Sequence, residues 1–166
     1  MEDFYIRKVA NGDEAILAYI QTESWKAAFK NIVSDDLLVR CTEINRATEM
    51  YHKLLENKKG NGYILEVKGE PHCIAWWDVT RESDMPGYAE LICIHSLPNN
   101  WHNGYGSKMM DCVLEDIKKS GYQKVMLWVF TDNHRACNFY ETKGFVATDK
   151  VQVVLEATEI MYVYNF

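Results

Sequence analysis

The chain has 166 residues, of which 48% are hydrophobic and 13% aromatic, a composition typical of a folded globular protein. This length fits a single domain, residues 1–166, better than two domains. The formal net charge is −6, and Lys and Arg form no run, which argues against nucleic acid as a partner. No apolar run approaches the roughly 20 residues of a membrane span, and the opening residues do not read as a signal peptide. We therefore expect a cytoplasmic protein with no membrane partner.

Cysteine and histidine are scattered rather than arranged as ligand sets. The five cysteines form no C-x-x-C pair, and their odd number favours reduced thiols over a disulfide framework. His72-Cys73 and Cys93/His95 are close pairs of metal-binding residue types, but they lack the paired spacing of zinc modules. The sequence therefore predicts no metal site.

The first third of the chain begins with a strand and continues as helix. Residues 4–9 favour a short strand, and Asp13 can cap a helix whose apolar stripe runs to Ala27. A second helical region is predicted from about residue 35 to 57. From residue 62 the pattern changes to strands.

Residues 62–67 and 71–80 flank a short glycine-containing loop, which favours a β-hairpin. A further strand is predicted for residues 88–96. After a turn-rich loop, an amphipathic helix with Met109 and Val113 on its apolar face ends near Gly121.

Residues 125–130 lack polar alternation, as expected of a central strand that is covered on both faces. A short helix at 133–143 and two closing strands follow. The strand–helix–strand unit from 88 to 130 predicts a parallel crossover, and the other strands follow as hairpins, so the sheet is predicted to be mixed.

The loop between the strand at 88–96 and the amphipathic helix is the most informative stretch. It reads His102-Asn103-Gly104-Tyr105-Gly106-Ser107. Two glycines allow positive φ and a close approach of a ligand to the main chain, and a helix start offers N–H groups to an anion. A pyrophosphate fits such a loop. A Rossmann fingerprint is excluded because its third glycine falls on Met109, and no Walker sequence is present.

Three segments in chain order carry a shared pattern: the strand Ala89–Pro98, the loop Trp101–Gly106, and the stretch Asn133–Phe145, which reads N-x-x-A-x-x-x-Y-x-x-x-G-F. Together they resemble the GNAT superfamily of N-acetyltransferases, and the resemblance extends over the whole chain. It implies the α/β (α+β) GNAT fold, with a mixed six- to seven-stranded sheet flanked by about four helices. It also implies acetyl-CoA as cosubstrate, without a metal.

The resemblance assigns a role to each matching position. The backbone of the strand would hold the pantetheine arm, the loop would wrap the pyrophosphate, and Asn133 would bond the pantetheine or acetyl end. The coenzyme-binding residues implied in the strand and the loop are Ile94, His95, Ser96, His102, Asn103, Gly104, Tyr105, Gly106 and Ser107. One position departs from the family: Trp101 replaces its Gln or Arg, so we expect weakened coenzyme affinity.

Acetyl transfer needs an amine that has lost a proton, a donor for the developing oxyanion, and a proton for the departing thiolate. The resemblance implies Tyr140 as the acid, and a phenol carries the proton that the role requires. Glu90 is the candidate base, and the alternative is an edge or surface carboxylate that pairs with a lysine. His95 and Asp78 are alternatives for the base.

The acceptor is less well specified. Trp25 and Phe29 resemble the family's acceptor-side wall, and nearby Glu23, Asp35 and Asp36 could favour a cationic amine or simply form a solvated helix face. We expect transfer of an acetyl group to a primary amine of a small molecule, by direct attack in a ternary complex. The alternatives are a protein or peptide N-acetyltransferase and a CoA-binding module with little turnover. A homodimer is possible.

Overall fold

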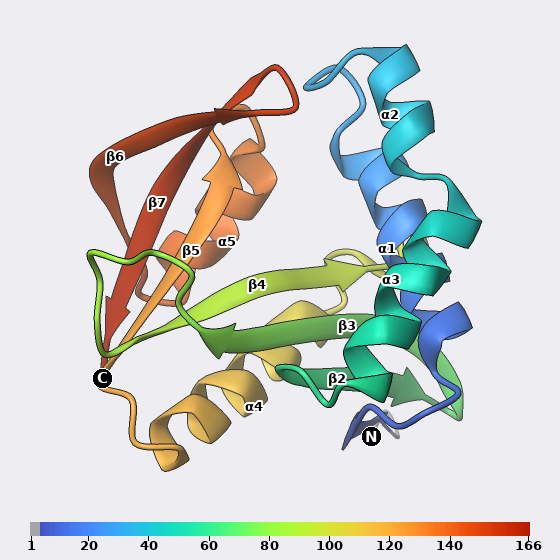
Figure 1. Cartoon of the computed structure of the whole chain (residues 1–166), viewed down its shortest axis with the longest axis horizontal. Coiled ribbons are helices and arrows are strands. Elements are labelled where there is room, and N and C mark those ends of the chain that lie inside the picture. The colour runs from blue at the N-terminus through green and yellow to red at the C-terminus, as the bar shows by residue number, and fades with distance from the viewer. Residues whose placement is uncertain (1–3) are drawn as a thin grey trace.

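Seven strands form one sheet in the order β1-β2-β3-β4-β5-β7-β6, with helices on both faces (Figure 1). The structure is a computed structural model, and it describes residues 4–166. The strands are β1 (Phe4–Lys8), β2 (Asn61–Val67), β3 (Glu70–Val79), β4 (Tyr88–Ser96), β5 (Lys124–Phe130), β6 (Val146–Val154) and β7 (Ala157–Asn165). The helices in this part of the chain are α1 (Glu14–Ala28), α2 (Asp35–Cys41), α3 (Ile44–Glu56), the 3-10 helix η1 (Pro98–Asn100), α4 (Tyr105–Lys119) and α5 (His134–Thr142).

The β4–α4–β5 unit is a parallel crossover, as the sequence predicts, and every other strand pair is antiparallel. The mixed seven-stranded sheet confirms the predicted fold class. The described chain has five α-helices where about four were expected, because the helical region predicted at 35–57 is divided. Glu43 explains the division, since its carboxylate accepts hydrogen bonds from the backbone N–H groups of Asn45 and Arg46 and so caps a new helix, α3.

Asp13 occupies the N-cap position of α1, but its side chain makes no cap hydrogen bond. Its carboxylate instead forms a salt bridge with Arg7 at 2.8 Å and accepts a bond from the N–H of Ala10. The guanidinium of Arg7 holds the pKa of Asp13 below its ordinary value. The predicted cap is therefore wrong in its partner, and Asp13 joins the first strand to the first helix.

The two faces of the sheet carry separate apolar cores. Helices α4 and α5 pack on one face, and α1 and α3 pack on the other (Figure 1). The first core has its helical contributions at Tyr105, Met109, Met110, Val113, Leu114, Ile117, Cys137 and Tyr140. The second has them at Leu17, Ala18, Ile20, Ala47, Tyr51 and Leu55. The apolar stripes of these helices are thus satisfied by the sheet between them.

Strands β4 and β5 stay together for only a short distance. Three residue pairs join them, and the last is Glu90 with Met126. Beyond that pair the strands part, as their directions in Figure 1 show. A bulge marks the same place: Trp76 pairs with Cys93 and Trp77 with Leu91, so Ile92 of β4 is the extra residue. A wedge therefore opens in the middle of the sheet.

Within residues 4–166, no helix combines the length and the apolar character needed to cross a bilayer. The same part of the chain contains no group of three or more His, Cys, Asp or Glu side chains that could hold a metal ion.

Candidate functional site

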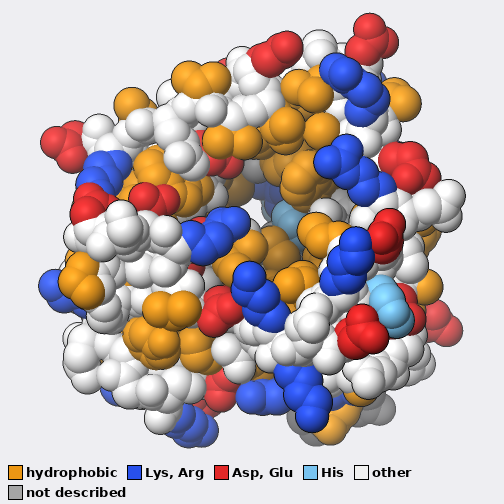
Figure 2. Space-filling model, viewed as in Figure 1, with side chains coloured by type: hydrophobic (Ala, Val, Ile, Leu, Met, Phe, Trp, Pro, Cys, Tyr) orange, Lys and Arg blue, Asp and Glu red, His pale blue; other side chains and the backbone are white. Residues whose placement is uncertain are grey.

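The wedge between β4 and β5 holds a cavity of about 530 Å³. This volume lies within the range of small-molecule sites. Its walls come from both helical layers and from strands on either side of the wedge, and Figure 2 shows it as a hollow bordered by hydrophobic side chains. The cavity therefore connects the two faces of the sheet.

Six of the residues predicted for the site line this cavity. They are Ile94, His95, Ser96, Gly106, Asn133 and Tyr140. They come from β4, the start of α4, and α5, which lie far apart in the sequence. Because β4 lacks β5 as a partner beyond Glu90, this edge of Leu91–Ser96 presents backbone N–H and C=O groups toward the wedge.

The glycine loop leads from β4 into α4 at one end of the cavity. His102 and Gly104 have positive φ values of 65° and 82°. Of the two glycines for which the sequence allows a positive φ, only Gly104 adopts one. Gly106 instead lies in the first turn of α4, where an added Cβ would meet nothing closer than Phe139 at 3.7 Å. No side chain caps this helix. The helix start is thus open to a ligand.

The remaining loop residues lie outside the cavity wall. His102, Asn103 and Gly104 are exposed, whereas the Tyr105 side chain is buried in the core and stacks on His72. Any contact that Tyr105 makes with a coenzyme is therefore restricted to its backbone.

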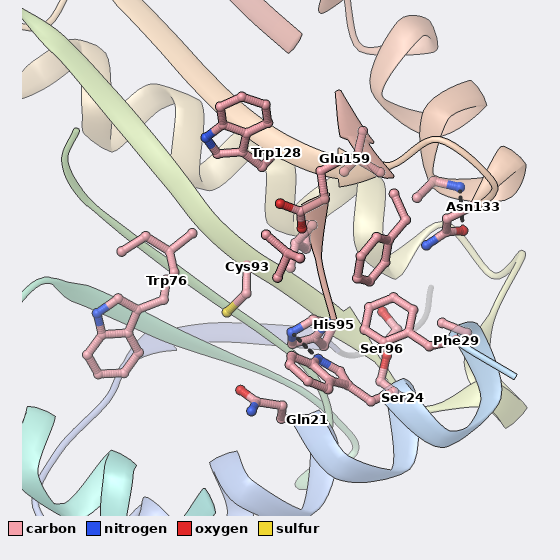
Figure 3. A pocket seen from close by; sticks show the side chains of 18 of the residues that line it. Gln21, Ser24, Phe29, Trp76, Cys93, His95, Ser96, Trp128, Asn133 and Glu159 are labelled. Atoms are coloured by element: carbon pink, nitrogen blue, oxygen red, sulfur yellow. Dashed lines mark hydrogen bonds between the residues drawn. The ribbon is translucent and has the colours of Figure 1, made fainter. Parts of the chain in front are cut away.

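Helix α5 brings two predicted residues to the cavity from one face. The Asn133 side chain accepts a hydrogen bond from the N–H of Ala136 at 3.2 Å, which fixes its oxygen and leaves its amide nitrogen for another partner (Figure 3). The hydroxyl of Tyr140 makes no hydrogen bond to any residue in the described chain. Burial raises the pKa of Tyr140 above its ordinary value, so the phenol keeps its proton at neutral pH.

His95 is held by a neighbouring ring. Its Nε2 accepts a hydrogen bond from the indole N–H of Trp25 at 3.2 Å (Figure 3). Burial lowers the pKa of His95 to about 4, so the imidazole is neutral at physiological pH. An imidazole whose Nε2 is occupied and whose conjugate acid is this strong is a poor base.

The structure does not bring Glu90 to the cavity. Its side chain is 2% exposed, and both carboxylate oxygens are bound by Arg81, whose guanidinium lies at 2.6 Å and whose backbone N–H also donates. The physical reason is its position, because Glu90 is the last residue of β4 that pairs with β5 and lies at the closed end of the wedge. The alternative considered from the sequence, an edge or surface carboxylate paired with a lysine, is right about an ion pair but wrong about its place and partner, since Glu90 is buried and its partner is Arg81.

Trp101 replaces the family's Gln or Arg, and a cation lies on its ring. The indole N–H donates to the backbone oxygen of Ser96 at 3.0 Å, and the guanidinium carbon of Arg135 lies 3.6 Å from the ring centroid. Arg135 forms no salt bridge with any residue from 4 to 166, and it lines the cavity. A stacked, unpaired guanidinium beside the glycine loop suits an anionic group.

The other end of the cavity is aromatic and was only partly anticipated. Trp25 and Phe29, which were predicted for an acceptor wall, do line it. The sequence does not reveal the other rings or the carboxylate that join them, namely Trp76, Trp128, Phe130 and Glu159. For Trp128, one sequence signal was available. Successive residues of a strand point to opposite faces, so Trp128 lies on the face opposite to the core that contains its neighbours Leu127 and Val129.

The acidic residues suggested near this wall lie elsewhere. Glu23 pairs with Lys26 at 2.8 Å, and Asp35 and Asp36 are exposed in the first turn of α2. None of the three lines the cavity. The interpretation of these residues as a solvated helix face is confirmed.

A model of the Acetyltransferase (GNAT) family matches residues 31–145. This match covers more than half of the sequence, so the chain belongs to the GNAT acetyltransferase family. Among curated proteins, an uncharacterized N-acetyltransferase of Methanocaldococcus jannaschii is 29% identical over 106 residues, which make up 61% of this chain and 46% of that protein. The chain therefore spans about half the length of this relative.

Solved structures confirm the fold. The PaiA N-acetyltransferase of Thermoplasma acidophilum, in complex with coenzyme A, is similar with a TM-score of 0.81 at 18% identity, over 98% of this chain and 99% of that one. YncA of Salmonella typhimurium with its cofactor acetyl-CoA is similar with a TM-score of 0.75 at 16% identity, over 98% and 93% of the two chains. The predicted GNAT architecture is therefore confirmed.

Proposed function

We propose that the chain works as one domain that transfers the acetyl group of acetyl-CoA to a primary amine of a small molecule, by direct attack in a ternary complex. The observation that carries the proposal is the cavity in the wedge, which has an uncapped helix start at one end and the unpaired Tyr140 hydroxyl in its wall. Both structural relatives described above are similar to this chain over the whole sheet, and their coenzymes support the assignment.

The chain offers complementary groups to each part of the coenzyme. The unpaired edge of β4 suits the amides of a pantetheine arm, and the start of α4 suits a diphosphate. Arg135 supplies the positive charge that position 101 lacks. The amide nitrogen of Asn133 is left to bind a carbonyl oxygen near the thioester.

The same groups suit the chemistry of transfer. Backbone N–H groups at the parted edge of β4 can donate to the carbonyl oxygen as it gains negative charge. Tyr140 can give its proton to the sulfur as the C–S bond breaks, because its phenol is protonated at the pH of the reaction. Two neutral donors therefore stabilise the two positions where negative charge develops.

The proposal is tested by calorimetry with CoA and by thiol release from acetyl-CoA in the presence of a panel of amines, with protein thiols subtracted. Tyr140→Phe is expected to lower kcat by roughly 100-fold with the Kd for CoA unchanged, because a general acid contributes on that scale. Tyr122→Phe, which removes the hydroxyl of a tyrosine that does not line the cavity, is the matched control. CoA binding without transfer to any amine would identify a binding module, and absence of CoA binding would overturn the proposal.

A further inference from the structure

We propose that the cavity end opposite the coenzyme binds a primary amine carried on an aromatic or branched apolar body, with the carboxylate of Glu159 receiving the ammonium group. This inference rests on the function proposed above and names the class of acceptor.

The wall at this end is built mainly from aromatic rings. Trp25 and Phe29 of α1 lie with their centroids 5.1 Å apart, and Phe29 meets Phe130 of β5 edge to face at 4.9 Å. Trp76 of β3 and Trp128 of β5 also line the cavity, away from Phe29 in Figure 3. Ring walls of this kind bind an apolar body by removing its surface from water, and the orientation of the rings favours another ring.

Glu159 is the carboxylate that remains available among these rings. Its side chain projects from β7 into the cavity, toward the space between Trp128 and Cys93 (Figure 3). One of its oxygens accepts a hydrogen bond from the side chain of Gln152 at 2.8 Å, which orients the group and leaves the other oxygen open. No Lys or Arg of the described chain lies within salt-bridge distance of it.

The other acids and bases in or near the cavity are either engaged or poorly placed. Glu90 is neutralised by Arg81, and the Nε2 of His95 is occupied by Trp25. Asp78 also lines the cavity and keeps one oxygen open, but it pairs with Glu90 at the closed end of the wedge, whereas Glu159 pairs with Phe130 in the open part. Glu159 is therefore the best-placed group for an ammonium ion that must approach the thioester.

The charge of the surrounding residues limits what else the acceptor can carry. Basic side chains lie around the hollow in Figure 2, and those on the cavity wall are Lys59, Arg81 and Arg135. Arg81 is paired with Glu90, whereas Lys59 and Arg135 form no salt bridge within residues 4–166. A second positive charge on the acceptor would lie against these two cations, which disfavours polyamines and aminoglycosides. An acceptor with one ammonium group and an uncharged apolar body avoids that repulsion.

The proton balance of the step follows. Glu159 takes one proton from the ammonium, and the nitrogen lone pair forms the C–N bond to the thioester carbon. The C–S bond breaks, and the thiolate receives the proton of Tyr140. The second proton of the nitrogen then returns to the tyrosinate, and the proton on Glu159 passes to solvent. The products are an N-substituted acetamide, CoA and one proton.

The test compares kcat/KM for 2-phenylethylamine, ethylamine, spermidine, phenylalanine and a short peptide with a free amino terminus. We expect 2-phenylethylamine to exceed ethylamine by roughly 100-fold, the factor associated with burial of a phenyl ring. A preference for spermidine, phenylalanine or the peptide would overturn this inference while leaving the proposed function intact. Absence of transfer to every amine would instead count against the proposed function.

A second measurement examines Glu159 directly. Glu159→Gln is expected to raise KM for 2-phenylethylamine by about 10-fold, because the neutral amide loses the charge that receives the ammonium group, with the Kd for CoA unchanged. Glu115→Gln, an exposed carboxamide substitution on α4, is the matched control. If Glu159→Gln keeps the KM and kcat of the unaltered protein for 2-phenylethylamine, Glu159 is not the group that receives the ammonium.

Discussion

At the scale of single residues, the guanidinium of Arg135 stacks on the ring of Trp101, a contact that the sequence alone does not predict. Trp101 is anchored by its bond to the backbone of Ser96, so its ring is a fixed platform for the guanidinium at 3.6 Å. The ring holds the cation in place without neutralising it, as a carboxylate would. We therefore expect Arg135, 34 positions along the chain, to offset the departure from the family pattern at Trp101.

Arg135→Met should raise the Kd for CoA by roughly 10-fold, because a charge-assisted contact to phosphate is lost. Trp101→Leu should produce a similar loss by releasing the guanidinium, and Arg40→Met, an exposed substitution on α2, should produce none. Calorimetry at two salt concentrations measures the effect, which should shrink at high salt. An equal loss with acetyl-pantetheine, which has no diphosphate, would show that Arg135 acts elsewhere.

His95 should make the stability of the unliganded protein depend on pH. The pKa of His95 falls to about 4 in the folded state, below the ordinary value near 6.5, so the unfolded chain binds more protons between these limits. The free energy of unfolding should therefore fall as the pH drops through this window, by about 2 kcal/mol between pH 7 and pH 5 at most.

Denaturant titrations at several pH values would measure this dependence. His95→Gln is the comparison, because the amide does not titrate, and its stability should change less over the same range. Equal slopes for the two proteins would show that His95 does not carry the linkage.

The residues that could be predicted from the sequence share a local basis. Asn133 is the N-cap of α5 and Tyr140 lies seven positions further along the chain, so their common side of the helix follows from helical geometry. Glu159 and Arg81 could not be predicted, because their place in the cavity depends on how distant strands pair. Glu90 was predicted as the base from its residue type and its strand. The sequence did not reveal that Arg81, nine positions away, binds its carboxylate.

At the scale of elements, hairpins and helices were predictable and the parting of strands was not. The bounds of β4 agree with the predicted strand, and β2 and β3 agree within one residue, because alternating apolar residues and turn signals define them. The wedge depends instead on the extra residue Ile92 and on where β4 loses its neighbour, and neither leaves a mark in the apolar pattern.

The first turn of α4 provides a test at this scale. Gly106→Ala adds a methyl group that meets only the Phe139 ring at ordinary contact distance, so the free energy of unfolding should stay the same or rise by up to about 1 kcal/mol. The Kd for CoA should nevertheless rise by roughly 10-fold, because the methyl group narrows the space at the start of α4 that we propose for the diphosphate.

Thermal denaturation and calorimetry separate these two effects, and Glu115→Ala on the exposed face of the same helix is the control. A variant that binds CoA as well as the unaltered protein would show that the diphosphate lies away from Gly106. A large loss of stability would instead show that the helix start is more tightly packed than the contact at 3.7 Å indicates.

At the scale of the whole molecule, the sheet consists of two parts that meet along a short seam. Strands β1–β4 form one part and β5–β7 the other, and three residue pairs of β4 and β5 join them. The cavity has walls on both parts, with Ile94 on one side and Val129 on the other. A ligand in the wedge therefore contacts both parts and should hold them together.

CoA at about 100 times its Kd should stabilise the protein by about 2.7 kcal/mol, which corresponds to a rise in Tm of roughly 5–10 °C for a chain of this size. Hydrogen exchange should slow at residues 91–96 and at residues 128–130 together, because both walls lose local opening when the wedge is filled. The edge strand β1 serves as an internal control, since it lies at the far edge of the sheet, none of its residues lines the cavity, and it should change little. Protection confined to β4 would mean that the ligand binds the first part alone. The two parts would then be held together by the three residue pairs of β4 and β5 and not by the coenzyme.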